Sequence, residues 1–153
     1  MANVVCNIAK GRMVEFYKRI VDNDPANSAF ILIPVATTGL EADSVLIDKQ
    51  TVADFFSGTT SIQSTLPRVT ITNAELAALS VANMTGDYYS IYLPDFGYVS
   101  ATGAAISKLL VAFDYDTAAG TDSTLIPCAV LDFALTPDGN SVSVTGGEFH
   151  RST

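Results

Sequence analysis

The sequence is short of charged side chains. Only 16% of its 153 residues are Asp, Glu, Lys or Arg, whereas about 25% is usual for a soluble domain. Serine and threonine together outnumber the charged residues, and the mean hydropathy is +0.32. A surface of small neutral groups and some apolar area is tolerated where neighbouring molecules cover it. The composition therefore favours a protein that works in an assembly, and a monomer with a large core is the alternative.

Residues that carry the common kinds of catalytic chemistry are also scarce. The single histidine, His150, lies near the end of the sequence, where residues are usually frayed, so a histidine-assisted nucleophile is not expected. Cys6 and Cys128 lie far apart within apolar runs. This spacing does not fit a structural zinc site. The apolar neighbours predict that both cysteines are buried free thiols, which is consistent with a reducing compartment. No phosphate-binding glycine motif occurs. We therefore expect a non-enzymatic protein without catalytic residues, cofactor or metal.

The sequence has neither an excess of positive charge nor a long apolar run. Its net charge is -8 and its pI is about 4.3, which argues against nucleic-acid binding, because phosphate contacts need clustered lysine and arginine. No run of about twenty apolar residues could cross a membrane. The first residues lack the basic start of a signal peptide. We expect no nucleic-acid or membrane partner and a protein made and kept in a cytoplasm.

The few bases are concentrated near the start of the sequence. They are Lys10, Arg12, Lys18 and Arg19, and only Glu15 opposes them within the first twenty residues. Apolar residues recur here at helical spacing, so residues 9–23 are predicted to form a basic amphipathic helix that ends before Pro25. A helix packed on a sheet with its charges in solvent is favoured over a membrane-surface element.

Residues 105–149 are predicted to form three consecutive antiparallel strands around which the chain is organised. Apolar residues alternate over 109–115 and 129–135, and a shorter alternation covers 141–144. Pro137 and Gly139 lie between the last two runs and predict a hairpin turn. A three-residue loop with a glycine bulge is favoured, because a two-residue loop needs an N–H at Pro137. The resulting stagger suggests that both faces of the sheet are covered.

Shorter patterns complete the predicted fold. Residues 1–8 are an N-terminal arm or strand, residues 28–35 a strand buried on both faces that ends near Pro34, and residues 58–67 a loop with little to pack. Further strands are predicted over 68–71, 88–93 and 96–99, an extended segment over 45–47, and short helices over 51–56 and 72–79. The sequence thus indicates a single domain, 1–153, of the β-rich α+β class. We expect a mainly antiparallel sheet or sandwich of about seven strands with two or three short helices.

Tyrosines gather in one predicted pair of strands. Four of the six are Tyr88, Tyr89, Tyr92 and Tyr98. Tyrosine combines apolar area with a polar tip and is enriched at interfaces. The segment is therefore a candidate protein interface, with ordinary strand packing as the alternative.

Three carboxylates lie around a glycine in the segment Asp114–Asp122. Oxygen ligands of this kind suit Ca²⁺. However, the segment lacks a third donor before its glycine and has Leu125 where an EF-hand loop has glutamate. A solvated turn is expected, and Ca²⁺ binding is the alternative. A pair of carboxylates for acid–base chemistry on a sugar stays open, although no pair is singled out.

Three phrases of the sequence carry a likeness to a known group of proteins. They are NIAKGR with the following VDNDPANSA, the run ISKLLVAFDYDT with GTD and IP after it, and TPDGN with the FHR near the end. In these phrases the chain resembles small virion proteins of tailed bacteriophages, most like those that decorate or cement the capsid. The resemblance implies a non-enzymatic, β-rich protein that docks on the assembled capsid shell as symmetric copies.

The leading hypothesis from the sequence is a capsid decoration or cement protein. Its partners would be the major capsid protein and copies of itself, and its location the virion. The candidate interface consists of the four bases, which would face an acidic neighbour, and the four tyrosines. A phage neck or tail component is the first alternative. A carbohydrate-binding module or small hydrolase is the second, and the absence of tryptophan counts against it.

Overall fold

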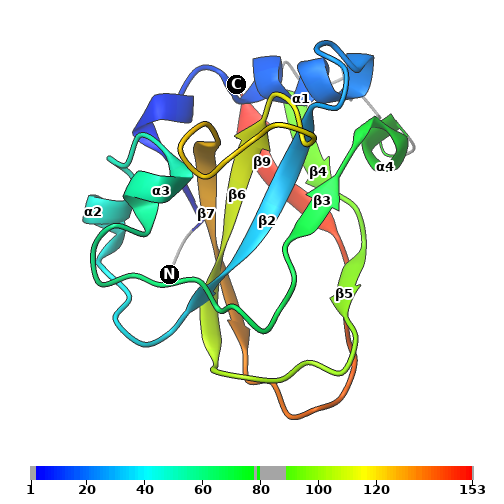
Figure 1. Cartoon of the computed structure of the whole chain (residues 1–153). Coiled ribbons are helices and arrows are strands. Elements are labelled where there is room, and N and C mark those ends of the chain that lie inside the picture. The colour runs from blue at the N-terminus through cyan, green and yellow to red at the C-terminus, as the bar shows by residue number, and fades with distance from the viewer. Residues whose placement is uncertain (1–2, 78, 80–88, 153) are drawn as a thin grey trace.

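A five-stranded antiparallel sheet forms the centre of the fold (Figure 1). The computed structural model describes residues 3–77, 79 and 89–152, and the main sheet has the order β1-β7-β6-β2-β3. Its strands are β1 (Val4–Val5), β2 (Ala29–Ala36), β3 (Val69–Ile71), β6 (Ile106–Asp114) and β7 (Ile126–Leu135). All pairings within this sheet are antiparallel. The predicted β-rich α+β class is confirmed.

Two separate strand pairs and several short helices complete the fold. The pairs are β4 (Tyr89–Leu93) with β9 (Gly147–Ser152) and β5 (Phe96–Tyr98) with β8 (Val142–Val144). The helical segments are η1 (Asn7–Ala9), α1 (Met13–Asp22), α2 (Asp43–Leu46), α3 (Val52–Phe55) and α4 (Asn73–Ala77). Figure 1 shows β9 crossing the main sheet at an angle, so the strands form two layers.

Strand alternation buries both faces of the main sheet. On β2, Phe30 and Leu32 belong to one buried apolar cluster, whereas Ile31 and Ile33 belong to another. Residues of α1, α4, β4 and β9 pack on the first cluster, and residues of α2 and α3 on the second. Removing apolar area from water on two faces is the main stabilising term of such a fold. The predicted coverage of both faces is confirmed.

The sequence predicted that the strand over residues 28–35 ends near Pro34, but β2 runs past it. It continues to Ala36, and Pro34 lies opposite Leu109 of β6. The carbonyl oxygen of Pro34 accepts a hydrogen bond from the Gln63 amide at 3.0 Å, so the backbone of Pro34 faces away from β6. The missing N–H of Pro34 therefore lies on the side of β2 that faces β3. β3 pairs only with Phe30–Leu32, so it has ended before it reaches Pro34. The ladder with β6 therefore loses no hydrogen bond.

The predicted hairpin between the last two alternating runs is wrong. β8 pairs with β5, whereas β7 pairs with β6 and β1. The turn itself forms with Gly139 at φ +90°, but its Gly139 amide donates to the Ala101 carbonyl at 2.7 Å. The turn thus bonds to the connection between β5 and β6, and the chain crosses from one layer to the other.

The tail is ordered as a strand that the sequence did not predict. His150 lies opposite Ile91 in the pairing of β9 with β4. Phe149 beside it packs edge-on against Phe30 of the main sheet, with 6.0 Å between ring centroids. This packing explains why residues 147–152 form a paired strand.

Two loop predictions are also corrected. Residues 45–47 are not extended, because α2 forms there and buries Leu46 in the second cluster. Residues 58–67 pack closely, since Gln63 and Leu66 are each 3% exposed. The Gln63 side-chain amide donates to the Thr102 carbonyl at 2.9 Å and to the Ala104 carbonyl at 3.1 Å, which ties this loop to the segment before β6.

Candidate functional site

The predicted amphipathic helix forms as α1. It begins at Met13 rather than at residue 9, because the 3-10 segment η1 and Gly11, with φ +78°, precede it. Its buried side consists of Met13, Phe16, Tyr17 and Ile20. Phe16 stacks on Phe113 of β6 with 4.5 Å between ring centroids, and this contact fixes the helix on the sheet.

The four predicted interface bases divide into two kinds. Lys10 and Lys18 are exposed, whereas Arg12 and Arg19 are half-buried and both donate to Glu15, at 3.2 Å and 2.9 Å. These hydrogen bonds lower the pKa of the Glu15 carboxyl. The Arg12 guanidinium also lies 4.6 Å from the centroid of the Phe16 ring, a cation–π contact. The arginines are therefore part of the helix's own packing. Lys10 and Lys18 are the more exposed bases, although Lys18 also lies 3.8 Å from Asp22 in a surface ion pair.

The tyrosine segment does not form one surface. Tyr98 is 1% exposed and belongs to the core, which rules it out as an interface residue of the folded chain. Burial raises its pKa to about 12. Tyr89 and Tyr92 are half-buried on β4, and Tyr89 packs edge-on against Tyr17 of α1, with 5.9 Å between centroids. Tyr88 lies outside the described residues.

A buried ion-pair cluster lies where α2 meets the main sheet. The Lys108 side chain on β6 is 2% exposed, and its Nζ lies 2.9 Å from Asp43 of α2 and 2.7 Å from Asp132 of β7. Burial alone would lower the pKa of Lys108, but the hydrogen bonds to Asp132 and Asp43 outweigh it and leave the pKa raised. The cluster joins α2 to strands β6 and β7 of the main sheet.

The carboxylates of the Asp114–Asp122 segment are held by the protein itself. Asp122 forms a two-bond pair with Arg68, at 2.6 Å and 2.9 Å, and this pair lowers the pKa of Asp122. Asp114 accepts a hydrogen bond from the Asp116 amide at 3.1 Å, and the same group packs against Gly120. Across the described ranges, no three side chains of Asp, Glu, His or Cys stand together as metal ligands would. The structure thus offers no support for a Ca²⁺ site here.

The cysteines form no disulfide and are both fully buried, as predicted. The Cys6 amide donates to the Cys128 carbonyl at 2.9 Å, which extends the pairing of β1 with β7. Burial raises the pKa of the Cys6 thiol to about 12. A thiol that stays protonated is a poor nucleophile. The pair contributes packing and not reactivity.

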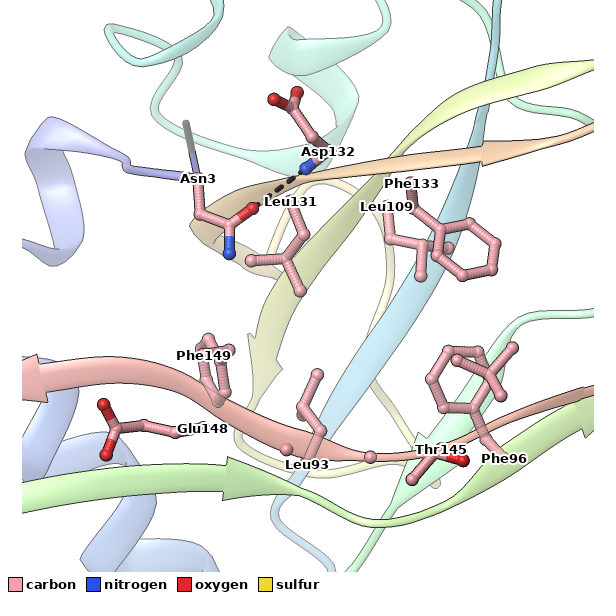
Figure 2. A pocket seen from close by; sticks show the side chains of 13 residues that line it. Asn3, Leu93, Phe96, Leu109, Leu131, Asp132, Phe133, Thr145, Glu148 and Phe149 are labelled. Atoms are coloured by element: carbon pink, nitrogen blue, oxygen red, sulfur yellow. Dashed lines mark hydrogen bonds between the residues drawn. The ribbon is translucent and has the colours of Figure 1, made fainter. Parts of the chain in front are cut away.

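An open apolar cleft lies between β7 and β9 (Figure 2). Its volume is about 230 Å³. Leu131 and Phe133 project from β7, and Leu93 and Phe149 face them from the β4–β9 pair. The other lining residues are Asn3, Phe96, Leu109, Asp132, Val144, Thr145, Gly146, Gly147 and Glu148. The carboxylates of Asp132 and Glu148 point away from the hollow, so its walls are mainly apolar, although Asn3 and Thr145 also line it.

The cleft was missed by the sequence predictions because it joins strands from different layers. The only local signal is the pair Gly146–Gly147, two residues before Phe149, which exposes backbone where a side chain would otherwise fill the space. A side-chain Cβ added at Gly147 would meet no atom within 4 Å, whereas one added at Gly146 would overlap the Leu93 carbonyl.

Comparison with known proteins identifies no relative. Within the described part of the chain, every helix is too short or too polar to cross a bilayer. The chain matches no family model, no curated protein and no solved structure.

Proposed function

We propose that this chain is a non-enzymatic decoration or cement protein of a tailed-bacteriophage capsid. The proposal rests on the resemblance in the sequence and on the kind of surface that the fold presents. Exposed residues are mostly small and neutral in the connecting segments, such as 57–61 and 117–124. Surfaces of this kind suit contact with a neighbouring protein more than they suit chemistry on a small molecule.

The observation that carries the proposal is the character of the cleft between β7 and β9. An enzyme pocket combines apolar walls with a few polar groups that converge on the substrate. Here the walls are mainly apolar, and the carboxylates at the rim are already paired: Asp132 with Lys108, and Glu148 with Arg151. The geometry favours burial against another protein.

Helix α1 supplies the charged part of the proposed capsid contact. The exposed bases are Lys10, which precedes the helix, and Lys18 within it. They belong to a segment whose four bases outnumber its three acids, Glu15, Asp22 and Asp24. The chain as a whole carries a net charge of -8. An acidic patch on the capsid would therefore be attracted to α1 and repelled elsewhere, which sets the orientation of docking. Repetition of a modest contact over the capsid lattice gives high avidity.

The test is incorporation of variants into particles. The double variant Lys10→Glu and Lys18→Glu should reduce the copies per capsid at least about tenfold, because each substitution replaces attraction by repulsion. Lys10→Arg with Lys18→Arg is the matched control and should bind as the parent does. Both lysines are exposed, and the ion pair of Lys18 with Asp22 lies at the surface, so either double change should cost less than about 1 kcal/mol of stability. Equal occupancy for the two double variants would contradict the proposed orientation.

Copy number separates this function from the neck or tail alternative. A cement protein covers many equivalent positions of the shell, whereas a neck component occurs in the few copies of one symmetric ring. A cryo-EM map of particles that contain the protein reads both copy number and location. Density confined to the neck or tail would overturn the capsid proposal.

A further inference from the structure

Asp114, the last residue of β6, is a buried carboxylate without a counter-ion. It is only 6% exposed. Its Oδ1 atom accepts a hydrogen bond from the Asp116 amide at 3.1 Å. Within the described ranges, no further hydrogen bond and no ion pair joins the Asp114 side chain to the rest of the chain. Because burying a carboxylate is costly unless it is paired, the Oδ2 atom of Asp114 is a candidate partner for a cation.

A hollow of about 130 Å³ opens beside this carboxylate, in the connection between β6 and β7. We call it the Asp114 hollow, and its lining residues are Asp114, Tyr115, Asp116, Ala119, Gly120 and Thr124. Gly120 makes room for the carboxylate, since a Cβ there would lie 2.3 Å from both oxygens of Asp114. Tyr115, Ala119 and Thr124 are exposed, so a partner can reach the hollow from outside.

The charges around the Asp114 hollow favour a cation. Asp116 also lines it, and the Oδ1 atom of Asp116 accepts a hydrogen bond from the Ala118 amide at 3.0 Å. Each of the two carboxylates thus uses one oxygen for a loop amide and keeps its Oδ2 atom for another donor. No lysine or arginine is among the lining residues. Arg12 reaches the Tyr115 hydroxyl at 3.4 Å, but its charge is paired with Glu15.

A second hollow next to Asp114 is less suited to a cation. Its volume is about 150 Å³, and Arg68 and Asp122 are among its lining residues. The guanidinium of Arg68 already pairs with Asp122, at 2.6 Å and 2.9 Å, and its charge would oppose a second cation. We therefore expect a cation to approach from the Asp114 hollow.

The donor set selects an ammonium group over other cations. A Ca²⁺ ion needs six to eight oxygen ligands, and among the described residues no three acidic, histidine or cysteine side chains stand together. The planar fork of arginine suits the two oxygens of one carboxylate. Here the available oxygens belong to two carboxylates, Asp114 and Asp116. The three donors of an ammonium group can reach separate acceptors of this kind.

The walls of the hollow suit the stem of a lysine side chain. Tyr115 is 37% exposed, and its ring packs edge-on against Phe113, with 4.7 Å between centroids, so the ring is held in place. Lysine buries its methylene groups along apolar surface while its ammonium stays with polar partners. An aromatic ring beside the ammonium adds a cation–π attraction. Tyr115 and Ala119 offer such a surface next to the two carboxylates.

We propose that the Asp114 hollow binds a lysine side chain of a neighbouring protein. The ammonium pairs with Asp114 and Asp116, and the stem lies along Tyr115. This inference does not depend on the capsid proposal, because it concerns carboxylates of the β6–β7 connection and not the bases near α1. Its test uses the isolated chain in solution, whereas the capsid proposal is tested on particles, so the failure of one is distinct from the failure of the other.

A blocked tripeptide tests the proposal on the full chain. The probe is acetyl-Gly-Lys-Gly-amide, whose lysine is its only charged group, and the readout is the NMR shift of the Asp116 and Gly120 amides. These shifts should saturate with a dissociation constant of about 10 mM or below. The same peptide with acetylated lysine has lost its charge, and its initial slope of shift against concentration should be at least about fivefold smaller. The peptide with arginine in place of lysine should also bind more weakly.

Three variants locate the binding. Asp114→Asn and Asp116→Asn keep the size of each side chain and an oxygen for the loop amide, but remove the charge. Each should reduce the slope for the lysine peptide at least about fivefold. Asp138→Asn is the matched control, because Asp138 is an exposed acid beyond the far end of β7, and its slope should stay within about twofold of the parent. Urea unfolding checks that each variant is folded, and Asp116, which is only half-buried, carries the test if Asp114→Asn does not fold.

Four outcomes would overturn the proposal. One is the absence of saturable shifts at about 10 mM lysine peptide, or equal slopes for the lysine and acetyl-lysine peptides. Another is a parental slope in Asp116→Asn and in folded Asp114→Asn. A third is an equal loss in Asp138→Asn, which would show that only the net charge matters. The fourth is a shift of the same amides by CaCl₂ at lower concentrations than by the peptide, because the occupant would then be a metal ion.

Discussion

Lys108 on β6 donates a hydrogen bond to Asp132 on β7 over 2.7 Å while only 2% of its own side chain is exposed. The same ammonium lies 2.9 Å from Asp43, so one cation joins two strands and the short helix α2. A buried charge is tolerated only when it is paired and hydrogen-bonded. The relationship explains how a lysine fits within a strand whose other residues, apart from Ser107, are all buried.

Lys108→Met should destabilise the fold by about 3 kcal/mol. The substitution keeps an unbranched chain but leaves Asp43 and Asp132 close together without their shared cation, and the loss of one partner is the costly way to break a buried pair. Urea unfolding measures the change. Lys18→Met is the matched control, because Lys18 is 60% exposed and lies 3.8 Å from Asp22 at the surface, and it should cost less than about 1 kcal/mol.

Rescue distinguishes the lost charge from lost packing. Adding Asp43→Asn and Asp132→Asn to Lys108→Met removes the repulsion between the carboxylates, and most of the stability should return. A triple variant as unstable as Lys108→Met alone would show that the packing of the lysine stem, and not its charge, matters.

Stability should fall at alkaline pH, beginning near the ordinary pKa of a thiol. Burial raises the pKa of Cys6 to about 12 and that of Cys128 well above its usual range. A group with a raised folded-state pKa contributes stability that is present below its unfolded pKa and is lost as the pH rises through the folded pKa. For the thiols this loss begins at about pH 8.5. The measurement is the free energy of unfolding in urea between pH 7 and 11.

The double variant Cys6→Ala and Cys128→Ala isolates the thiols from other groups. Tyr98, whose pKa burial raises to about 12, and Lys108 also have raised folded-state pKa values, and their unfolded values lie near 10. The onset of destabilisation should therefore move from about pH 8.5 to about pH 10 in the double variant. An unchanged onset would mean that the thiols are not the first groups to titrate.

How far the sequence predicts this fold depends on the range of the interactions. The continuous apolar run of β2 and the alternation along β6 and β7 depend on each strand alone, and these strands form as predicted. Coverage of both faces was predicted from a hairpin stagger that does not form, and the packing of helices on each face produces it instead. The pairing partner of β8 cannot be predicted in this way. Pro137 and Gly139 indicate that the chain reverses, but they do not indicate which strand β8 then pairs with. The hydrogen bond from Gly139 to Ala101 decides this, and residues far apart in sequence form it.

The candidate site was less predictable than the fold for the same reason. The bases of residues 10–19 are visible as a local pattern, and Lys10 and Lys18 remain candidates. Tyr98 was wrongly assigned to the surface, since alternation in a three-residue strand does not say which face is buried. The cleft needs β7 and β9 to meet across two layers, and no local pattern encodes that meeting.

Phe16→Ala should loosen α1 from the sheet. Phe16 is 0% exposed and stacks on Phe113, so truncation leaves a cavity that the rigid β6 strand cannot close. The expected loss is about 3 to 5 kcal/mol of unfolding free energy. Val21→Ala on the same helix is the comparison, because Val21 is only half-buried and its truncation should cost clearly less. Equal losses would show that α1 is not anchored at Phe16.

Gly120→Ala tests the packing of the Asp114–Asp122 segment. A Cβ at Gly120 would lie 2.3 Å from both carboxylate oxygens of Asp114, a side chain that is itself buried. Because Asp114 has little room to move, the change should cost about 1 to 3 kcal/mol. Gly147→Ala, where nothing lies within 4 Å, is the matched control and should be within about 0.5 kcal/mol of the parent. If Asp114→Ala added to Gly120→Ala restores much of the loss, the clash with the carboxylate is its cause. If both glycine variants unfold at the same urea concentration as the parent, the segment is more yielding than its close contacts imply.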